Sequence, residues 1–429
     1  MSMNYEEALE YIHHVSWTGV KPGLSRTFEL LDRMGNPQKQ LKFVHIAGTN
    51  GKGSTAAMTA SILEKSGYRT GLYTSPFIHR FNERMQVNGE SITDEELAEL
   101  TEWIRPMAET MEDSPTEFEL ITALAMEFFR RQVCDIVVLE VGMGGELDST
   151  NVIDTPEMAV ITAIGLDHTA ELGDTLGKIA SAKGGIIKAC GDVVIYPQAE
   201  EAEIVLKQMA EEKYCHVFQP DFSAITPVSE TLSGQTFDYG KYHGLKIPMA
   251  GNYQQRNAAV VVTVCERLAA KGWHITEQNI RDGLADTRWR GRFEVLSEKP
   301  AVIVDGSHNP HGIRATAESL RKYFPDGGII FIIGVCADKD VPHMMEQLVP
   351  MAKEFVTTQA SYYRAMPAGK LAELMRTMTD LPVTPEADVR KACALALEKA
   401  GSDGTVCAMG TLYMVGDVTV SLEDLLKQR

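Results

Sequence analysis

The sequence predicts an α/β fold with two domains: an N-terminal domain built on a mostly parallel, P-loop-type sheet and a smaller, Rossmann-like C-terminal α/β domain. Three observations support this prediction. The chain has 429 residues, which exceeds the usual size of one domain. Apolar runs of strand length alternate with helical patterns, as in parallel sheets covered by helices on both faces. A glycine-rich segment joins one such strand to the next helix.

The N-terminal elements follow from their apolar patterns. A strand is predicted at residues 41–47 and the helix after it at 54–65. A helix at 119–131 leads into a strand at 135–141, and another buried strand is expected at 158–164. This order of strands and helices predicts the parallel sheet.

The last third of the chain begins a new alternation. Helices are expected between strands at 301–305, 329–334 and 354–358. We place a linker around residues 289–299. The predicted domains are therefore 1–290 and 291–429.

Composition narrows the classes of protein. A formal net charge of −18 argues against a general nucleic-acid binder, which needs a basic face. It also means that any site for phosphates or carboxylates must create its positive field locally. The seven cysteines form no C-x-x-C pair, which fits reduced thiols better than a disulfide framework. The N-terminus is polar, and no apolar run approaches the roughly 20 residues that span a bilayer. We expect a cytoplasmic protein without membrane partners.

The segment from Gly48 to Thr55, GTNGKGST, is the strongest local signal. Glycines let backbone N–H groups approach phosphate oxygens, and the N-terminus of the next helix adds a favourable dipole. The spacing departs from a full Walker A motif, because Ile46 stands where its first glycine should be. By itself the loop leaves kinase, GTPase, ATPase and ligase open. The candidate nucleotide-binding residues are Thr49, Asn50, Gly51, Lys52, Gly53, Ser54 and Thr55.

Three further residues are candidates for chemistry at such a loop. Glu140 ends a predicted strand, where a carboxylate can hold magnesium opposite the phosphates. His168 follows another predicted strand, although imidazole is an unusual magnesium ligand. Lys183 lies in a helical segment and is chemically indistinguishable from Lys178 or Lys188.

Together the motifs resemble the folylpolyglutamate synthases, and the bifunctional dihydrofolate synthase/folylpolyglutamate synthases, of the Mur-ligase superfamily. The resemblance runs essentially end to end and rests on many short motifs in the family's order. The matching segments are residues 21–26 (KPGLSR), 35–37, 45–55, 74–77, 81–84 (FNER), 138–151, 166–188, 251–259, 291–294 (GRFE), 305–310 (DGSHNP), 334–340 and 410–413 (GTLY).

The resemblance implies a role for each matching residue. It implies ATP and two magnesium ions, with Lys183 carbamylated by carbon dioxide so that it can hold the second ion. The implied metal ligands are Ser54, Ser75, Glu140, His168 and Lys183. The implied nucleotide contacts beyond the loop are Asn257, Arg292 and Asp305. The implied substrate residues are Phe77, Arg84 and Phe118 for the pterin, with His308 and Thr411 for glutamate. The implied catalytic residues are Lys52, His168, Lys183, Asp305 and His308.

Five positions depart from the family's pattern. Ala182 replaces an acidic residue, Gly184 replaces alanine, and Glu146 stands where a basic residue is usual. Tyr253 replaces histidine, and Thr411 replaces serine but keeps the hydroxyl. None of these departures removes a residue that is implied to bind phosphate or metal, so a ligase is still expected.

The implied activity is the ATP-dependent addition of L-glutamate to a folate through an acyl phosphate. The substrate is tetrahydrofolate, and dihydropteroate is expected as a second one. Closure of the C-terminal domain about the linker would exclude water from the reactive intermediate. The resemblance also suggests a monomer.

Other functions were weighed against this one. A peptidoglycan-precursor ligase fits residues 22–26 and 81–84 less well than a folate enzyme does. A P-loop kinase or switch would leave residues 305–310 unexplained. A non-catalytic relative should have lost Lys52, Glu140 or His168, and all three are present. Whether the protein also acts on dihydropteroate stays open, although residues 81–84 favour polyglutamylation.

Overall fold

The structure, a computed structural model, describes residues 3–14 and 23–429. Lys21 and Pro22, which open the motif at 21–26, lie outside the described residues. The chain divides into two compact units. The first comprises the described residues up to Ser223 together with 257–287, and the second comprises 224–256 with 288–429. The predicted α/β class with a separate C-terminal α/β unit is confirmed, while the exact boundary at residue 290 stays a prediction.

The first unit contains an eight-stranded sheet in the order β4-β3-β2-β5-β1-β6-β7-β8. In this sheet order, all neighbouring strands from β2 through β5, β1, β6 and β7 to β8 pair in parallel. At the other edge, β3 pairs antiparallel with both β2 and β4. The central strands β1, β5 and β6 are buried along their whole length, as their apolar sequences require. The strands are β1 (Phe43–Ala47), β2 (Thr70–Tyr73), β3 (Met85–Val87), β4 (Glu90–Ser91), β5 (Ile136–Glu140), β6 (Met158–Ile161), β7 (Asp192–Ile195) and β8 (His216–Phe218).

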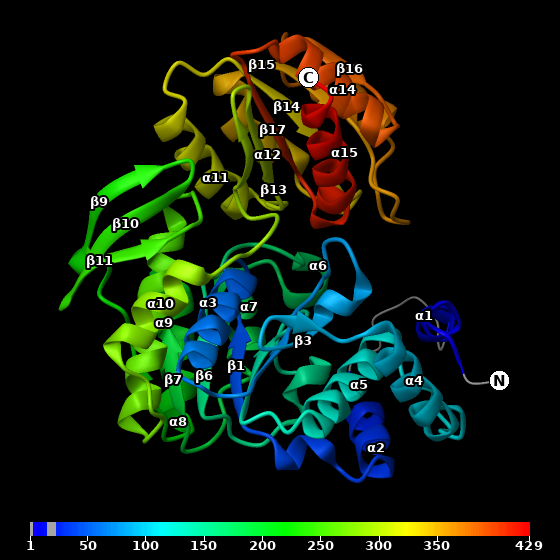
Figure 1. The fold of residues 1–429 in the computed structure, drawn as a ribbon, viewed down its shortest axis with the longest axis vertical. Coiled ribbons are helices and arrows are strands. Elements are labelled where there is room, and N and C mark those ends of the chain that lie inside the picture. Colours follow the sequence, from blue (N-terminus) through cyan, green and yellow to red (C-terminus); the bar gives the residue numbers. More distant parts are fainter. Residues whose placement is uncertain (1–2, 15–22) are drawn as a thin grey trace. The chain divides into compact units, whose positions relative to one another are not determined.

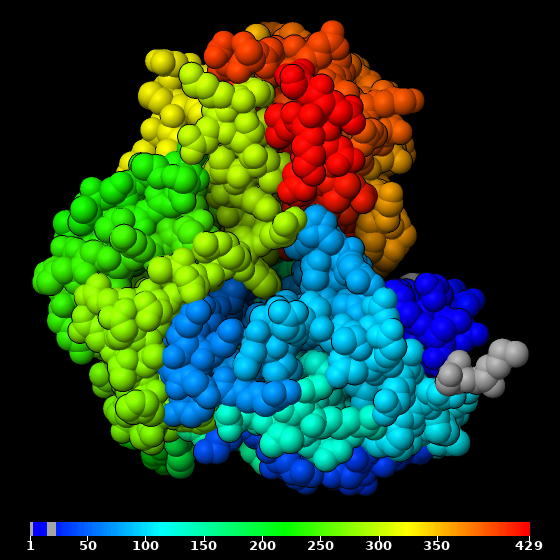
Figure 2. All heavy atoms as spheres, viewed as in Figure 1, coloured from blue at the N-terminus to red at the C-terminus, as the bar shows by residue number. Residues whose placement is uncertain are grey.

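Helices flank this sheet and enclose separate apolar clusters with it (Figure 1). One cluster joins the sheet to α4 and α5, and another joins it to α7 and α8. Helix α1 packs against α4, and Figure 2 shows its dark-blue atoms beside the cyan ones. The helices are α1 (Tyr5–His14), α2 (Ser25–Arg33), α3 (Lys52–Lys65), α4 (Asp94–Glu109), α5 (Glu117–Arg131), α6 (Thr169–Leu172), α7 (Leu176–Gly184), α8 (Glu200–Glu212), α9 (Tyr253–Ala270) and α10 (Glu277–Asp286).

The second unit contains a six-stranded sheet in the order β12-β13-β17-β14-β15-β16 and a separate antiparallel sheet in the order β11-β10-β9. The six-stranded sheet is parallel except for β12 at its edge. Its strands are β12 (Glu294–Glu298), β13 (Ala301–Asp305), β14 (Ile329–Ile333), β15 (Ala352–Thr357), β16 (Val383–Pro385) and β17 (Thr405–Met409). The small sheet has β9 (Ile225–Thr231), β10 (Gly234–Tyr239) and β11 (Tyr242–Ile247). The helices are α11 (Pro310–Tyr323), α12 (Val341–Leu348), α13 (Ala368–Arg376), α14 (Val389–Ala400) and α15 (Val415–Lys427).

The predicted elements all have counterparts, with ends that shift by up to about three residues. One detail of the predicted linker at 289–299 is wrong. Half of it is strand β12, which pairs antiparallel with β13, so only the residues before Glu294 are a connection. The small sheet was not predicted. In the described part of the chain, no helix is both long and apolar enough to cross a membrane.

Candidate functional site

The phosphate loop joins β1 to α3 in a conformation that requires glycine at two positions. Gly48 has φ of +152°, and a Cβ atom there would lie 1.8 Å from Oγ1 of Thr162. Gly51 is left-handed at the start of α3, and a Cβ atom there would lie 2.8 Å from Oδ1 of Asn257. Asn257, from α9, therefore lies directly against the loop, where it was expected to contact nucleotide.

The loop is tied to the segment that follows β6. The backbone N–H groups of Thr49 and Asn50 donate to the carbonyl of Ala163, at 2.9 and 3.1 Å. The Thr49 hydroxyl donates to the carbonyl of Gly165 and accepts from its N–H, at 3.0 and 3.1 Å. Four hydrogen bonds thus hold the loop against the segment after β6.

Lysines from distant parts of the unit converge on the loop. The Nζ atom of Lys52 donates to the carbonyls of Gly48 and Thr49, at 3.0 and 3.2 Å. The Nζ atom of Lys183, from α7, donates to the same Gly48 carbonyl at 2.9 Å. Two side chains that are cations in water therefore meet at one backbone oxygen. Lys52 supplies part of the local positive field that a chain with a net charge of −18 needs to hold phosphates.

Burial makes Lys183 unlike an ordinary lysine. Its side chain is almost completely buried, and this burial, together with the charge of Lys52, lowers its pKa to about 7. The carboxylates of Asp167 and Asp148 oppose the shift without cancelling it. A substantial fraction of Lys183 is therefore a neutral amine at physiological pH, and a neutral amine is a nucleophile.

The two lysines that sequence alone could not distinguish from Lys183 lie in different surroundings. Lys178 is exposed and pairs with Asp174 on the helix surface. Lys188 donates to the backbone carbonyl of Asn151 at 3.1 Å. Of the three, it is Lys183 that contacts the phosphate loop.

The loop's remaining candidates occupy the first turn of α3. Gly53, Ser54 and Thr55 are all buried, and the N–H of Thr55 is bonded to the carbonyl of Gly51. The Thr55 hydroxyl is buried and has no hydrogen-bond partner. The N-terminal turn of a helix presents its first backbone N–H groups to a ligand, which is the arrangement that binds anions.

Some of the predicted metal ligands lie together. Glu140 ends β5, is buried, and accepts a hydrogen bond from the N–H of Ser75 at 3.2 Å. His168 lies at the start of α6 in a left-handed conformation, with its N–H bonded to the carboxylate of Asp167. Within residues 3–14 and 23–429, no three His, Cys, Asp or Glu side chains form a metal-binding group.

The predicted substrate residues Phe77 and Arg84 pack against each other. The Arg84 guanidinium lies 5.4 Å from the ring centre of Phe77 and 5.6 Å from that of Phe81. One of its nitrogens donates to the Ser75 hydroxyl at 3.3 Å. Arg84 therefore connects an aromatic surface to the residue that contacts Glu140.

Phe118, at the start of α5, lies against the backbone that follows β5. A Cβ atom on Gly142 would lie 2.5 Å from its ring, and Tyr73 packs beside it with ring centres 6.2 Å apart. The glycine after Val141 thus makes room for this ring. In the first unit, one apolar cluster packs against both Phe77 and Phe118. Arg84 lies beside the same cluster, over the ring of Phe81.

Sequence reasoning missed a buried ion pair that supports Phe118. Arg26, from α2, donates twice to Glu119, at 3.0 and 2.9 Å, and once to Asp113 at 3.1 Å. Glu119 also accepts from the N–H of Thr116, which begins α5. Arg26 belongs to the matched motif at 21–26, which was the available signal.

A second missed feature is a chain of hydrogen bonds behind the segment after β5. The buried Asp148 accepts from the N–H of Met143 at 2.9 Å and from the Thr150 hydroxyl at 2.5 Å. Thr150 in turn contacts Nε2 of His45 at 2.9 Å. Burial lowers the pKa of His45 to about 3, so this imidazole is neutral. The chain fixes the loop that adjoins Phe118.

In the second unit Asp305 ends β13 with both carboxylate oxygens engaged. One oxygen accepts from the N–H of Phe293 at 2.8 Å and from the Tyr253 hydroxyl at 3.3 Å. The other accepts from the N–H of Ser307 and the hydroxyl of Thr316, each at 2.9 Å. Tyr253, where the family usually has histidine, is thus a hydrogen-bond donor to Asp305.

The other predicted residues of this unit surround the same segment. A Cβ atom on Gly306 would lie 2.7 Å from a guanidinium nitrogen of Arg292. His308 contacts the carbonyl of Gly306 through Nδ1 at 2.8 Å. Thr411 is buried after β17, where its hydroxyl accepts from the N–H of Tyr413 at 3.3 Å. Arg292 and His308 are therefore brought to the end of β13, and Thr411 to the end of β17.

Of the departures near Lys183, the one at Gly184 has a packing explanation. Glu146 contacts α7 through its backbone, because its N–H donates to the carbonyl of Ala182 at 2.9 Å. Gly185 lies so close to Glu146 that a Cβ atom would be 2.3 Å away from its side chain. At Gly184 a Cβ atom would lie 2.6 Å from the sulfur of Met209, so alanine does not fit without a shift.

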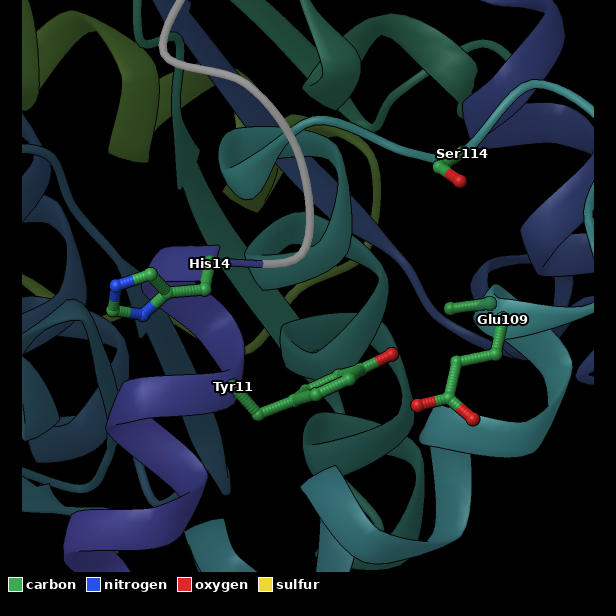
Figure 3. A pocket seen from close by; sticks show the side chains of 5 residues that line it. Tyr11, His14, Glu109 and Ser114 are labelled. Carbon is green, nitrogen blue, oxygen red and sulfur yellow. The ribbon is translucent and has the colours of Figure 1, made fainter.

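A cavity of about 310 Å³ lies elsewhere, between α1 and α4 (Figure 3). Burial, aided by the charge of Glu109, raises the pKa of Tyr11 in its wall to about 12. None of the predicted site residues lines it. The lining residues are Tyr11, His14, Ala108, Glu109 and Ser114.

Comparison with known proteins gives a consistent result. The model of the Mur ligase middle domain matches residues 46–265, and that of the Mur ligase glutamate ligase domain matches residues 291–412. The chain is 38% identical to a folylpolyglutamate synthase of Lacticaseibacillus casei over 89% of this chain and 95% of that protein. It is 35% identical to the dihydrofolate synthase/folylpolyglutamate synthase of Bacillus subtilis over 98% of this chain and 99% of that protein.

Solved structures agree with these relatives. The Mycobacterium tuberculosis folylpolyglutamate synthase complexed with ADP has a TM-score of 0.88 and 29% identity, covering 99% of this chain and 98% of that one. The Escherichia coli protein FolC in complex with DHPP and ADP has a TM-score of 0.87 and 28% identity, with the same coverage.

Proposed function

We propose that this chain, which belongs to the folylpolyglutamate synthase family of Mur ligases, is an ATP-dependent ligase that joins L-glutamate to a folate. The observation that carries the proposal is the convergence of Lys52 and Lys183 on the phosphate-loop carbonyl of Gly48. Relatives named for both activities support tetrahydrofolate and dihydropteroate as acceptors. The ADP and AMPPCP complexes of similar structures support ATP as the phosphoryl donor.

The reaction must activate a carboxylate, which is a poor electrophile. Transfer of the γ-phosphoryl group of ATP to the folate carboxylate forms an acyl phosphate and releases ADP. The glutamate amine then attacks the acyl carbon, a C–N bond forms, and the C–O bond to phosphate breaks. Phosphoryl transfer depends mainly on positioning and on neutralising charge, and Lys52 on the loop is placed to do both.

The residues at the loop fit a magnesium ion. Magnesium in nucleotide sites takes one or two protein oxygens and completes its shell with phosphates and water. Glu140 supplies the buried carboxylate, with Ser75 beside it and Ser54 in the first turn of α3. His168 is a further proposed ligand. When bound, magnesium neutralises charge on the transferred phosphoryl group.

Lys183 fits a carbamate. Carbon dioxide reacts with a neutral amine only, and burial lowers the pKa of Lys183 to about 7. The product carries a carboxylate in place of a cation and can hold a second magnesium ion. In this proposal Lys183 therefore acts as a metal ligand.

The remaining proposed contacts divide between substrates. Asn257 lies against the loop and is proposed to contact nucleotide, together with Arg292 and Asp305. Phe77, Arg84 and Phe118 are proposed to hold the pterin, whose flat ring suits an aromatic and cationic surface. His308 and Thr411 are proposed to contact glutamate. The chain is further proposed to act as a monomer in the cytoplasm, where its free cysteines stay reduced.

The test is ADP release by the purified protein with MgATP and L-glutamate, with tetrahydrofolate and dihydropteroate offered separately. Turnover with both acceptors is expected, and turnover with tetrahydrofolate alone would restrict the function to polyglutamylation. Lys52→Ala should abolish turnover, whereas Lys207→Ala, a surface lysine of α8, should not. Activity with neither acceptor, beside ATP hydrolysis indifferent to glutamate, would overturn the proposal.

A further inference from the structure

A second cationic group lies in the second unit, at the edge of the sheet that also carries Thr411. It is carried by the loops that follow β14 and β15. These loops are joined because the N–H of Ala337 donates to the carbonyl of Arg364 at 2.8 Å, and the N–H of Met366 to that of Val335 at 2.9 Å. Since β14, β15 and β17 are parallel, their carboxyl ends share one edge of the sheet. Ligands of open α/β sheets bind at this edge.

The Arg364 guanidinium is held against a pair of stacked tyrosines. The rings of Tyr362 and Tyr413 are parallel within 11°, with centres 3.8 Å apart. Arg364 lies 5.3 Å from the centre of the first ring and 5.9 Å from that of the second. One of its nitrogens donates to the Tyr413 hydroxyl at 3.4 Å. The tyrosines therefore orient the planar cation and limit its conformational freedom.

The same guanidinium keeps hydrogen-bonding capacity. Arginine has five N–H donors. Its Nε is buried without a hydrogen-bond partner, and its nearest carboxylate, that of Asp338, is 3.8 Å away. Asp338 also lies 3.8 Å from Nζ of Lys339. A single carboxylate thus faces two cations.

This arrangement of charge complements a free amino acid with an acidic side chain. Glutamate carries two carboxylates and one ammonium group, whereas the loops after β14 and β15 present the cations Arg364 and Lys339 beside Asp338, with the Asp340 carboxylate bonded to His343. A guanidinium binds a carboxylate through two parallel hydrogen bonds, and a flat aromatic backing leaves its edge available. The buried hydroxyl of Thr411, two residues before Tyr413, belongs to the same edge.

We propose that Arg364 binds a carboxylate of the incoming glutamate and determines specificity for it, with the Tyr362–Tyr413 stack as its support. This inference rests on the proposed function, because it names a residue that recognises the amino-acid substrate. Arg364 is a substrate-binding residue in this proposal and takes no part in phosphoryl transfer.

The test compares Michaelis constants in the wild type, Arg364→Gln and Arg364→Lys. With ATP and tetrahydrofolate saturating, the KM for glutamate should rise about 10- to 100-fold in Arg364→Gln, as expected for losing charge-assisted hydrogen bonds. The KM for glutamate of Arg364→Lys should lie between those of the wild type and Arg364→Gln, because lysine keeps the charge without the planar guanidinium. The KM values for ATP and tetrahydrofolate should stay within about twofold in both variants.

Two controls separate recognition from a structural effect. Arg390→Gln removes a half-exposed arginine of the same unit, paired with Asp424, and should leave the KM for glutamate unchanged. Tyr413→Phe keeps the ring stack and removes one hydrogen bond, so a rise of about two- to tenfold is expected. A KM for glutamate that stays at the wild-type value in Arg364→Gln overturns the inference, as does an equal rise for all three substrates.

The failure of the proposed function would look different, since the wild type itself would then show no glutamate-dependent turnover. In that event, calorimetric titration of L-glutamate into the wild type and into Arg364→Gln tests the inference by comparing their affinities for glutamate. Weaker binding by the variant supports it. Equal binding, or none by either protein, overturns it.

Discussion

The Nζ atom of Lys183 lies 2.9 Å from the carbonyl oxygen of Gly48, although 135 residues separate the two in sequence. The contact places a buried amine from α7 on the loop that follows β1. Lys52 donates to the same oxygen. Burial of the Lys183 ammonium, aided by the nearby charge of Lys52, lowers its pKa to about 7.

Lys183 should make stability depend on pH. Its pKa is lowered from 10.5 in the unfolded chain to about 7 in the folded state, so between these values the unfolded state binds more protons. The cost of burying the cation is therefore fully present below pH 7 and is relieved as the pH rises toward 10. Methionine does not carry this cost at any pH. In carbon-dioxide-free buffer, the free energy of unfolding of Lys183→Met minus that of the wild type should therefore fall by up to about 1.4 kcal/mol per pH unit between pH 7 and 10. Urea unfolding at pH 7, 8 and 9 measures this, and a constant difference would contradict it.

Carbamate formation should be specific to Lys183. With ¹³C-bicarbonate, a carbamate signal is expected in the NMR spectrum of the wild type and of Lys178→Arg, whose lysine is exposed. The signal should be missing in Lys183→Arg, because arginine cannot react in this way. A signal that persists in Lys183→Arg would assign the carbamate to another lysine, with Lys188 tested next by the same substitution.

Arg26→Gln should weaken both stability and folate binding. The substitution leaves Glu119 buried without its arginine, which typically costs about 3–5 kcal/mol of unfolding free energy. Because the pair holds the start of α5, the KM for tetrahydrofolate should rise more than the KM for ATP. Denaturant unfolding and initial rates check the two effects.

The control for this prediction is Arg105→Gln on α4, where the arginine is exposed and lies 4.0 Å from Glu109. Its effect on stability should stay below about 1 kcal/mol. Equal losses in the two variants would show that the buried pair has no special role.

Gly142→Ala should interfere with the proposed pterin site and leave nucleotide binding intact. The added methyl group would lie 2.5 Å from the ring of Phe118 and 3.2 Å from the carboxylate of Asp148, so the ring must move. The KM for tetrahydrofolate should rise about tenfold, while the dissociation constant of ADP should not change. Gly369→Ala, on α13 with nothing within 4 Å of its Cβ, should be indistinguishable from wild type or slightly more stable. An unchanged KM for tetrahydrofolate would remove Phe118 from the pterin site.

Local patterns were sufficient for most of the fold. The strand at 301–305 matches β13 at both ends, and the helix at 54–65 differs from α3 by the two residues of its glycine-rich first turn. The small sheet of β9 to β11 was not predicted, because β9 is largely exposed and lacks an apolar run. Strand β12 lay within the predicted linker, since its register depends on pairing with β13 and not on its own composition.

The sequence by itself determined the phosphate loop, the order of strands and helices, and the motifs that resemble one ligase family. These are local properties, set by glycine conformation, apolar periodicity and residue spacing. Only the tertiary structure decided which lysine contacts the loop, since Lys178, Lys183 and Lys188 differ in burial and in partners, not in chemistry. It also decided that Arg26 supports α5 and that Arg364 stacks on Tyr362. Such contacts join residues far apart in the chain, and their effect on charge depends on the desolvation that packing imposes.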